Sequence, residues 1–265
     1  MLPVYEAIDI IKVIPATVGH TQPWVVLANT PNGLKPFVTK LYTTAEVDNN
    51  NSVTNEIICN VLASQFDLKV PSCAFIDIPD SLQFKQPLEC QIQYSNADPR
   101  LKFATEMLAN VISAVPDLSK SYYSKRISLD TLYAFDNMIR NSDRGQQKTN
   151  LLLSSKTAFL IDHEYALHQK NIIGINWKGL EIDRRFTNYH LLHPYLKRSI
   201  KAKKQHYFDE FQEYLKTLNT KQLNSYFTQL SAEGFTTQSV NINSWLQQVK
   251  QNSTTFVHSL KSSLE

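Results

Sequence analysis

The segment from residue 141 to residue 162, NSDRGQQKTNLLLSSKTAFLID, constrains the fold more than any other part of this chain. Apolar residues at helical spacing over 127–140 predict a helix that runs into it. Its polar first half predicts a loop, and the apolar runs on either side of SSKT predict two short strands of a hairpin. In this arrangement the loop carries Asp143, its junction with the first strand carries Asn150, and the second strand ends at Asp162.

This order of side chains fits phosphoryl transfer. A loop carboxylate such as Asp143 can accept the proton of an attacking hydroxyl, and the oxygens of Asn150 and Asp162 are ligands that Mg²⁺ prefers. Each residue also has an ordinary explanation, because Asn, Ser and Asp favour turns and caps. Taken singly, that explanation is the better one for each of them. Their joint occurrence, in this order and on these elements, favours a catalytic base with two magnesium ligands.

Two charged residues upstream complete such a site. A strand expected over 36–42 places Lys40 beside apolar neighbours, and a helix expected over roughly 52–66 carries Glu56. A lysine within a strand is costly to bury unless an acid pairs with it. We therefore expect Lys40 to contact the α and β phosphates of ATP and Glu56 to hold it. A solvated or structural lysine is the alternative for this pair alone.

The segment 17–23, TVGHTQP, lies between the first two expected strands. Backbone N–H groups at Gly19 and His20, with the hydroxyl of Thr21, could cover the phosphates of a nucleotide there. The segment has a single glycine, so by itself it is a weak indication of a nucleotide loop.

Hydrophobic periodicity divides the chain into two parts, which predicts an α+β fold. Residues 1–109 are rich in strand patterns and residues 110–265 in helix patterns. Beside the helix over 52–66 and the 150–162 hairpin, strands are expected at 8–14, 24–28, 36–42 and 73–78, and helices near 203–217, 220–231 and 239–261. The turn between the second and third strands is expected at Pro31-Asn32-Gly33. Residues 79–99 show no clean period and read as an excursion.

Composition excludes several classes of protein. The chain has 265 residues, 42% of them hydrophobic, and a net charge of +3, so it can build a substantial core and whole-protein charge indicates no polyanionic partner. Its three cysteines fit neither a disulfide framework nor a zinc site and favour reduced thiols. The first residues lack the pattern of a signal peptide, and no run of 18 apolar residues predicts a membrane span. We therefore expect a cytoplasmic protein.

With these residues in view, the sequence resembles the HipA-like kinase family. Members share a pattern close to F-D-x-x-I-x-N-x-D-R, then N-L-L, then a strand ending in I-D-H. The matching segments here are 135–144, 150–152 and 160–163, with weaker matches at 19–23, 38–40, 55–63 and 68–71. The likeness covers roughly residues 8–168.

This resemblance implies a bilobal protein-kinase-like fold. The small N-lobe, residues 1–109, would hold an antiparallel sheet and one main helix, and the larger helical C-lobe would follow at 110–265. It implies Asp143 as the base, Asn150 and Asp162 as ligands of Mg²⁺, and Lys40 with Glu56 on the ATP phosphates. Residues 103–108 would be the hinge whose backbone, at Glu106 and Leu108, meets adenine.

Three features depart from the common pattern. Asn150 follows Asp143 by seven positions, a longer gap than in ordinary protein kinases, although some HipA-like kinases share it. Glu164 follows His163 where glycine is common, and the expected nucleotide loop is poor in glycine. None of these departures removes a catalytic group, which favours an active kinase.

The acceptor of the phosphate is less constrained. The resemblance favours a protein serine or threonine and suggests autophosphorylation at Thr17 or Thr21. The segment 194–206 holds five Lys or Arg and no acid, which suits an anionic substrate, a tRNA-bound enzyme or a membrane surface. A solvated helix face is the more ordinary explanation, and nucleic acid is not indicated beyond this weak basic segment. A small-molecule or lipid-headgroup kinase, and a kinase-like module without catalysis, are the alternative functions.

Overall fold

The computed structural model describes residues 1–15, 22–178, 180–200 and 206–265. They form a mixed α/β protein with two compact units, each built from segments far apart in the sequence. The first unit contains Met1–Ile57, Pro71–Ala109 and Ser225–Thr237, and the second contains Ile58–Val70, Asn110–Asn224 and Gln238–Glu265.

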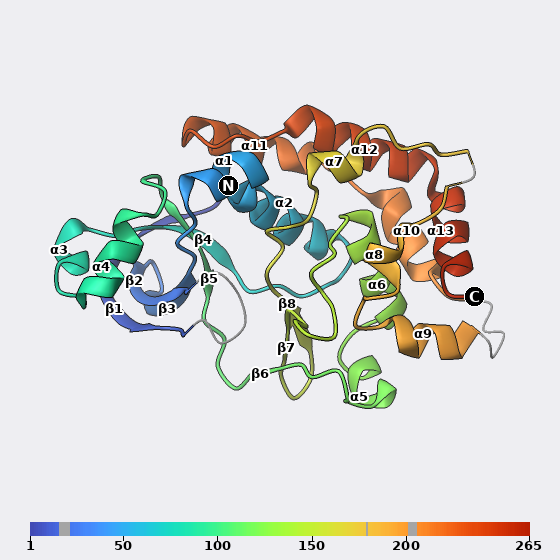
Figure 1. Cartoon of the computed structure of the whole chain (residues 1–265), viewed down its shortest axis with the longest axis horizontal. Helices are drawn as coiled ribbons and strands as arrows, with labels where there is room; N and C mark the ends of the chain where they lie inside the picture. The colour runs from blue at the N-terminus through green and yellow to red at the C-terminus, as the bar shows by residue number, and fades with distance from the viewer. Residues whose placement is uncertain (16–21, 179, 201–205) are drawn as a thin grey trace. The chain divides into compact units, whose positions relative to one another are not determined.

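Five strands of the first unit close into a barrel in the order β1-β2-β3-β5-β4 (Figure 1). They are β1 (Val4–Val13), β2 (Trp24–Thr30), β3 (Gly33–Thr39), β4 (Cys73–Asp77) and β5 (Lys102–Glu106). All neighbours pair antiparallel except β1 and β4, which run parallel with Val4 opposite Phe75. The expectation of an antiparallel sheet is therefore wrong at this pair. A helical crossover between β3 and β4 returns the chain in the direction of β3, which β1 shares.

The predicted turn between β2 and β3 is confirmed. Thr30 pairs with Gly33 across it, and the Thr30 hydroxyl donates to the Gly33 carbonyl at 2.7 Å. Gly33 has φ +93°, a left-handed conformation that costs glycine little. This tight hairpin starts β3 at Gly33 and ends it at Thr39, so Lys40 lies just beyond the strand and not in its middle, where it was expected. Its N–H still donates to the Phe103 carbonyl at 3.0 Å.

Two consecutive helices follow Lys40. The short α1 (Thr44–Asn50) starts with a capping box between Thr43 and Glu46, and the sequence pattern did not predict it. Asn51, at φ 56°, then redirects the chain into α2 (Ser52–Gln65), the predicted helix. Residues through Ile57 belong to the first unit and the rest of α2 to the second.

The excursion at 79–99 contains two short helices. They are α3 (Asp80–Gln83) and α4 (Leu88–Ser95), and each begins directly after a proline, Pro79 or Pro87. Proline before or at the start of a helix loses no hydrogen bond, because the first N–H groups have no partner within the helix. These helices are too short for a readable helical period, which explains why the sequence pattern there was unclear.

The second unit combines a three-stranded sheet with helices. Its sheet has the order β6-β7-β8, with β6 (Ile112–Ser113), β7 (Leu151–Leu153) and β8 (Ala158–Leu160). Its helical segments are α5 (Lys120–Ser124), α6 (Leu129–Met138), α7 (Gln169–Ile172), α8 (Arg184–Thr187), α9 (His193–Ile200), α10 (Asp209–Thr217), the 3₁₀ helix η1 (Thr220–Gln222), the start of α11 (Leu223–Ala232), α12 (Ser239–Gln251) and α13 (Ser253–Ser262).

Helix α6 is the centre of this unit. All but one of its residues are buried, and the Phe135 ring packs 5.5 Å from Phe66 between ring centroids. The Trp245 indole of α12 donates to the Met138 carbonyl at 2.8 Å and closes the end of α6. The helix predicted at 239–261 is two helices, broken at Asn252, whose side chain donates to the Gln248 carbonyl at 2.8 Å. Within the part of the chain that the structure describes, no helix is long and apolar enough to cross a membrane.

Candidate active site

The loop that follows α6 is shaped by its own polar side chains. Arg140 adopts a left-handed conformation, φ 56°, and the Asn141 N–H donates to the Asp136 carbonyl at 2.8 Å, which ends the helix. The Asn141 side chain donates to the Asp136 carboxylate at 3.0 Å and accepts from the backbone N–H of Asp143 at 3.0 Å. This Asx-type bond sets the backbone of Asp143 from the helix end.

A buried ion network holds this loop to helix α6. Arg144 donates to the Asp136 carboxylate at 2.7 Å, and both side chains have no exposed surface. His190 contacts the same carboxylate at 3.0 Å. Burial alone would raise the pKa of Asp136, but Arg144 and His190 hold that pKa well below its usual range. Arg144 also donates to the backbone carbonyl of Asn150 and lies 3.2 Å from His163.

Sequence reasoning missed this network. Asp136 and Arg144 were part of the quoted motif but had no role in the predicted site. Local pattern does not reveal which charged side chains are buried, and their eight-residue separation matches no helical contact spacing. One feature of the sequence could have revealed the network. Arg144 directly follows Asp143, so a cation lies in the expected catalytic loop itself.

The β7–β8 hairpin brings Asn150 and Asp162 to one end. Leu151 pairs with Leu160, and the Ile161 N–H donates to the Asn150 carbonyl at 3.2 Å. Asn150 has φ 45° and Asp162 has φ 63°, both in the left-handed region that Asn and Asp tolerate better than most residues.

Asp143, Asn150 and Asp162 meet within the second unit. The Lys148 ammonium lies 2.8 Å from the Asp143 carboxylate and 2.7 Å from that of Asp162. The Asn150 amide donates to the Asp143 carboxylate at 2.9 Å and to its backbone carbonyl at 3.0 Å. Burial opposes the charge on Lys148, but the two carboxylates outweigh burial and raise the pKa of Lys148. Sequence reasoning had passed over Lys148, which lies two positions before Asn150.

The position of Lys148 tests whether these residues suit a magnesium ion. A cation already lies within 2.8 Å of carboxylate oxygens from both Asp143 and Asp162, so the site attracts positive charge. The side chains around it supply carboxylate and amide oxygens and no sulfur, the donor set of a hard divalent cation. The residues present therefore fit Mg²⁺.

Lys40 and Glu56 meet within the first unit. Their ammonium and carboxylate form a close ion pair, in which the Glu56 side chain is only 3% exposed and that of Lys40 15%. The Tyr42 hydroxyl donates to the same Glu56 oxygen at 3.2 Å. A buried carboxylate with two donors is fixed in place and in turn fixes the flexible lysine stem.

The residues expected around adenine lie at the end of β5. The Glu106 side chain forms an ion pair with Lys35 at 2.8 Å, on the surface of the barrel. The N–H of Met107 donates to the Pro36 carbonyl at 2.9 Å, and Leu108 follows the strand. Gly19, His20 and Thr21, the predicted phosphate-covering residues, and Thr17 lie outside the described residues.

Two cavities of the second unit adjoin the Asp143 loop. One, of about 480 Å³, is lined by Asp143 itself, Lys148 and Tyr189, among others. The other, of about 660 Å³, is lined by the chain around Leu118 and by residues of α9. Gln146 lines both, so both cavities adjoin the loop that carries Asp143.

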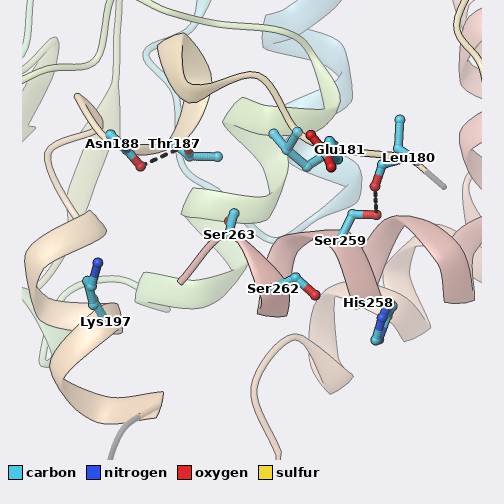
Figure 2. Close-up of a pocket in the computed structure, with 10 residues that line it drawn as sticks. Leu180, Glu181, Thr187, Asn188, Lys197, His258, Ser259, Ser262 and Ser263 are labelled. Carbon is cyan, nitrogen blue, oxygen red and sulfur yellow. Dashed lines mark hydrogen bonds between the residues drawn. The ribbon is translucent and has the colours of Figure 1, made fainter. Parts of the chain in front are cut away.

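A third cavity, also of about 660 Å³, lies along α13 (Figure 2). Ser259, Ser262 and Lys197 line it, and the Ser259 hydroxyl donates to the Leu180 carbonyl at 2.5 Å. None of the predicted site residues lines it. In the predicted basic segment, Lys197 therefore faces this cavity, while Arg198 lines the cavity next to Gln146. The lysines at 201, 203 and 204 lie outside the described residues.

Comparison with known proteins adds one positive finding. A family model described as HipA-like kinase matches residues 10–256, which is nearly the whole chain. No curated protein matches the chain. The matched range includes both the Lys40–Glu56 pair and the Asp143 cluster.

Proposed function

The chain belongs to the HipA-like kinase family, which implies a kinase, and we propose that it is an ATP- and Mg²⁺-dependent phosphotransferase with Asp143 as its catalytic base. The observation that carries this proposal is the pair of carboxylates, Asp143 and Asp162, on either side of the Lys148 ammonium, with the Asn150 amide donating to the Asp143 carboxylate. Two carboxylates that share a cation, with an amide side chain next to them at the end of a hairpin, are the kind of group that a metal-nucleotide site requires.

In this proposal Asn150 and Asp162 hold the magnesium ion. When bound, Mg²⁺ neutralises the phosphate charge, which is the main chemical demand of phosphoryl transfer. The left-handed backbone at both residues and the hairpin between them keep their oxygens at one end of β7 and β8. Lys40 binds the α and β phosphates of ATP, and Glu56 and Tyr42 keep its ammonium in place.

Asp143 accepts the proton of the acceptor hydroxyl. It suits this role because its side chain is 25% exposed, so a substrate can reach it, while Asn141 fixes its backbone. The Asp136–Arg144 ion pair holds the same loop to α6. A carboxylate base of this kind needs no unusual reactivity. Most of its contribution to the rate comes from being held against the acceptor hydroxyl.

We place adenine against the backbone of Glu106 and Leu108 at the end of β5, and the phosphates beneath Gly19, His20 and Thr21. The support is order along the chain, since the segment between β1 and β2 precedes Lys40 and the end of β5 follows it.

The acceptor in this proposal is a serine or threonine of a protein. The two cavities that share Gln146 are lined by Asp143 in one case and by Leu118 and residues of α9 in the other, and binding in both would suit several residues of an extended chain better than one compact molecule. The cavity farther from Asp143 is lined by Lys120, Arg198 and Asp117. Its lining therefore carries charges of both signs, with the positive ones in excess.

The proposal is tested by a thermal-shift titration with ATP and MgCl₂. A ligand that binds only the folded protein raises its stability, by about 2.7 kcal/mol at a hundred times Kd. We expect Tm to rise with ATP and MgCl₂ together and less with either alone. Transfer of the γ-phosphoryl group from radiolabelled ATP to protein in a lysate then identifies the acceptor class. If Tm did not change at millimolar ATP, the proposal would be overturned, and a kinase-like module that binds no nucleotide would be favoured.

A further inference from the structure

The first turns of α2 are held from two directions within the first unit. Glu56 receives Lys40 and Tyr42 on one side. Two residues earlier, the Thr54 hydroxyl donates to the backbone carbonyl of Thr236 at 2.8 Å. Thr54 is 1% exposed, and Thr236 is 182 positions away in the sequence. A distant segment of the chain therefore contacts α2 next to the residue that pairs with Lys40.

That segment, residues 230–236, is here called the strap. It begins at the end of α11, where Gly234 has φ +79°. The Phe235 N–H donates to the Leu230 carbonyl at 2.9 Å and the Gly234 N–H to the Ser231 carbonyl at 3.1 Å. These two bonds are those of a Schellman turn, which requires a left-handed residue and buries an apolar one after it. Phe235 is accordingly buried, in one cluster with Leu230.

Phe235 joins the strap to both the barrel and α2. Its ring stacks on Phe75 of β4, with 5.6 Å between centroids and 4° between planes. The same apolar cluster includes Val53 and Ile57, which come from the first turns of α2. The strap thus packs against the first turns of α2, on a different side of the helix from the side chain of Glu56, which follows Thr54 by two positions.

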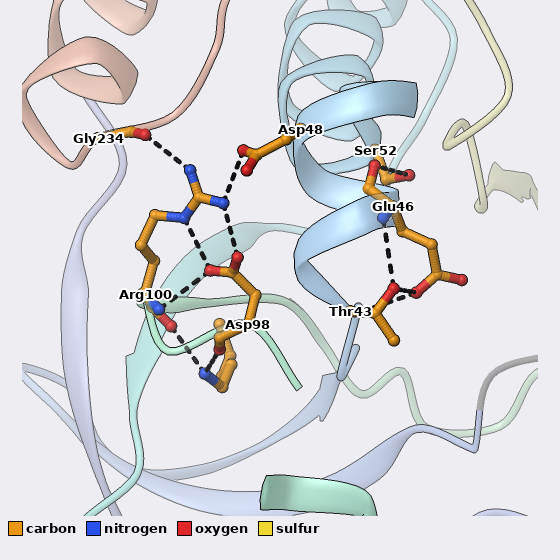
Figure 3. Close-up of polar contacts among 8 residues, drawn as sticks. Thr43, Glu46, Asp48, Ser52, Asp98, Arg100 and Gly234 are labelled. Carbon is orange, nitrogen blue, oxygen red and sulfur yellow. Dashed lines mark hydrogen bonds and ion pairs between the residues drawn. The ribbon is translucent and has the colours of Figure 1, made fainter. Parts of the chain in front are cut away.

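Arg100 fastens the strap (Figure 3). Its guanidinium donates to the Gly234 carbonyl at 2.7 Å, to Asp98 at 2.7 and 2.6 Å, and to Asp48 of α1 at 2.8 Å. It also lies 4.9 Å from the centroid of the Phe235 ring. Only a planar fork with several donors can make these contacts together, so lysine is no equivalent here.

We infer that the strap positions Glu56, and that Thr54, Phe235 and Arg100 are positioning residues for the Lys40–Glu56 pair. This inference rests on the proposed function, in which Lys40 binds the nucleotide phosphates. The ammonium of Lys40 is on a flexible stem, so its place is set by the carboxylate it meets. That carboxylate moves with α2, and a displacement of about 1 Å is enough to lose a hydrogen bond of this geometry.

A purely structural strap is the competing explanation. It would lower the stability of the unit when weakened, but it would leave the nucleotide affinity of the folded protein unchanged. A strap that acts through Glu56 would change that affinity, and the change would disappear once the Glu56 carboxylate was removed. A double-mutant cycle separates these two outcomes.

The experiment combines Thr54→Val with Glu56→Gln. Thr54→Val keeps the shape of the side chain and removes the donor to Thr236. The Kd for ATP with MgCl₂ is measured by calorimetry in the four proteins, under conditions where urea unfolding shows each to be folded. We expect Thr54→Val to weaken binding about five- to tenfold with Glu56 present and less than twofold in the Glu56→Gln background.

Thr30→Val is the matched control. Thr30 is also a buried threonine of the first unit that donates to a backbone carbonyl, that of Gly33 at 2.7 Å, but it lies in the β2–β3 turn. Its variant should lose stability without a change in Kd. Arg100→Lys keeps the positive charge but loses the fork, and it should weaken binding as Thr54→Val does, with the same dependence on Glu56.

The failures of the two proposals are distinguishable. If the unaltered protein binds no ATP with MgCl₂, the proposed function fails and the strap inference fails with it. If the unaltered protein binds ATP but Thr54→Val leaves Kd unchanged, or weakens binding equally in both backgrounds, the strap does not act through Glu56. In that case the kinase proposal stands and the strap inference is wrong.

Discussion

Asn150 and Asp162 lie at the same end of the β7–β8 hairpin, Asn150 directly before the first strand and Asp162 two residues after the second. Both are left-handed, at φ 45° and 63°, and the Leu151–Leu160 pair between them sets their separation. Two oxygen-bearing side chains are thereby held at the same end of a rigid element, which is preferable to a loop for a metal site.

Asp143→Asn should reduce phosphoryl transfer at least about a hundredfold, because an amide cannot accept the acceptor proton. Nucleotide binding should change less than about threefold, since the amide that replaces the carboxylate has the same shape and can still contact Asn150 and Lys148. Steady-state kcat with labelled ATP, and Kd by calorimetry, check the two halves of this prediction. Full activity in this variant would overturn the assignment of the base.

Asp162→Asn should weaken binding of ATP with MgCl₂ about tenfold or more. The variant removes the negative charge that the ion needs, while an amide of the same shape preserves the left-handed backbone. The measurement is Kd for ATP at several MgCl₂ concentrations. If Asp162→Asn retained the affinity and magnesium dependence of the unaltered protein, Asp162 would not be a metal ligand.

Lys148→Met should make the protein without nucleotide respond more strongly to MgCl₂ alone. Lys148 now lies 2.8 Å and 2.7 Å from Asp143 and Asp162, so it competes with an added cation for the same carboxylates. We expect a larger rise in Tm with MgCl₂ than in the unaltered protein. Lys156→Met, an exposed lysine of the β7–β8 turn, is the control and should show no gain.

Asp136→Asn should lower the free energy of unfolding at pH 7 by about 3–5 kcal/mol, because it leaves the buried Arg144 charge without its carboxylate. Arg144 and His190 lower the pKa of Asp136 in the folded protein. The stabilisation is therefore present above the unfolded pKa of about 3.9 and is lost as pH falls through the folded value. Urea unfolding between pH 7 and pH 2 should show a loss below about pH 4 that is steeper in the unaltered protein than in the variant.

Asp67→Asn is the control for that series. Asp67 pairs with Lys69 at the surface, where the side chains are 69% and 58% exposed, so the pair is worth at most about 1 kcal/mol. If the free energy of unfolding depended on pH equally in Asp136→Asn and in the unaltered protein, ionised Asp136 would not stabilise the folded protein.

Cys73 should react slowly with iodoacetamide in the folded protein. Burial, and then the negative charge of Glu56, raise the pKa of its thiol to about 12, so about one thiol in ten thousand is ionised at pH 8. The rate should rise about tenfold per pH unit below that pKa. Glu56→Gln should lower the pKa and speed the reaction, with modification located by mass spectrometry. The unfolded protein gives the reference rate, and a native rate equal to it would contradict the prediction.

Local pattern was sufficient for the elements that carry the candidate site. Helical spacing predicted α6, alternation and Pro31-Asn32-Gly33 predicted the β2–β3 hairpin, and the apolar runs predicted β7 and β8. These predictions hold because they depend on residues close together in the chain. The boundary of β3 was misplaced because pairing from a tight turn, and not propensity, decides where a strand ends.

The sequence by itself determined the order of helix, loop and hairpin, the family, and the polar residues that meet in the Asp143 cluster. Tertiary structure alone decided which charges are buried, as in the Asp136–Arg144 pair, and which cation lies between Asp143 and Asp162. It also decided that β1 closes on β4 in parallel and that residues 230–236 return to α2. The physical reason is that these contacts join segments far apart in the chain, and their free energy depends on desolvation and on neighbours that no local pattern contains.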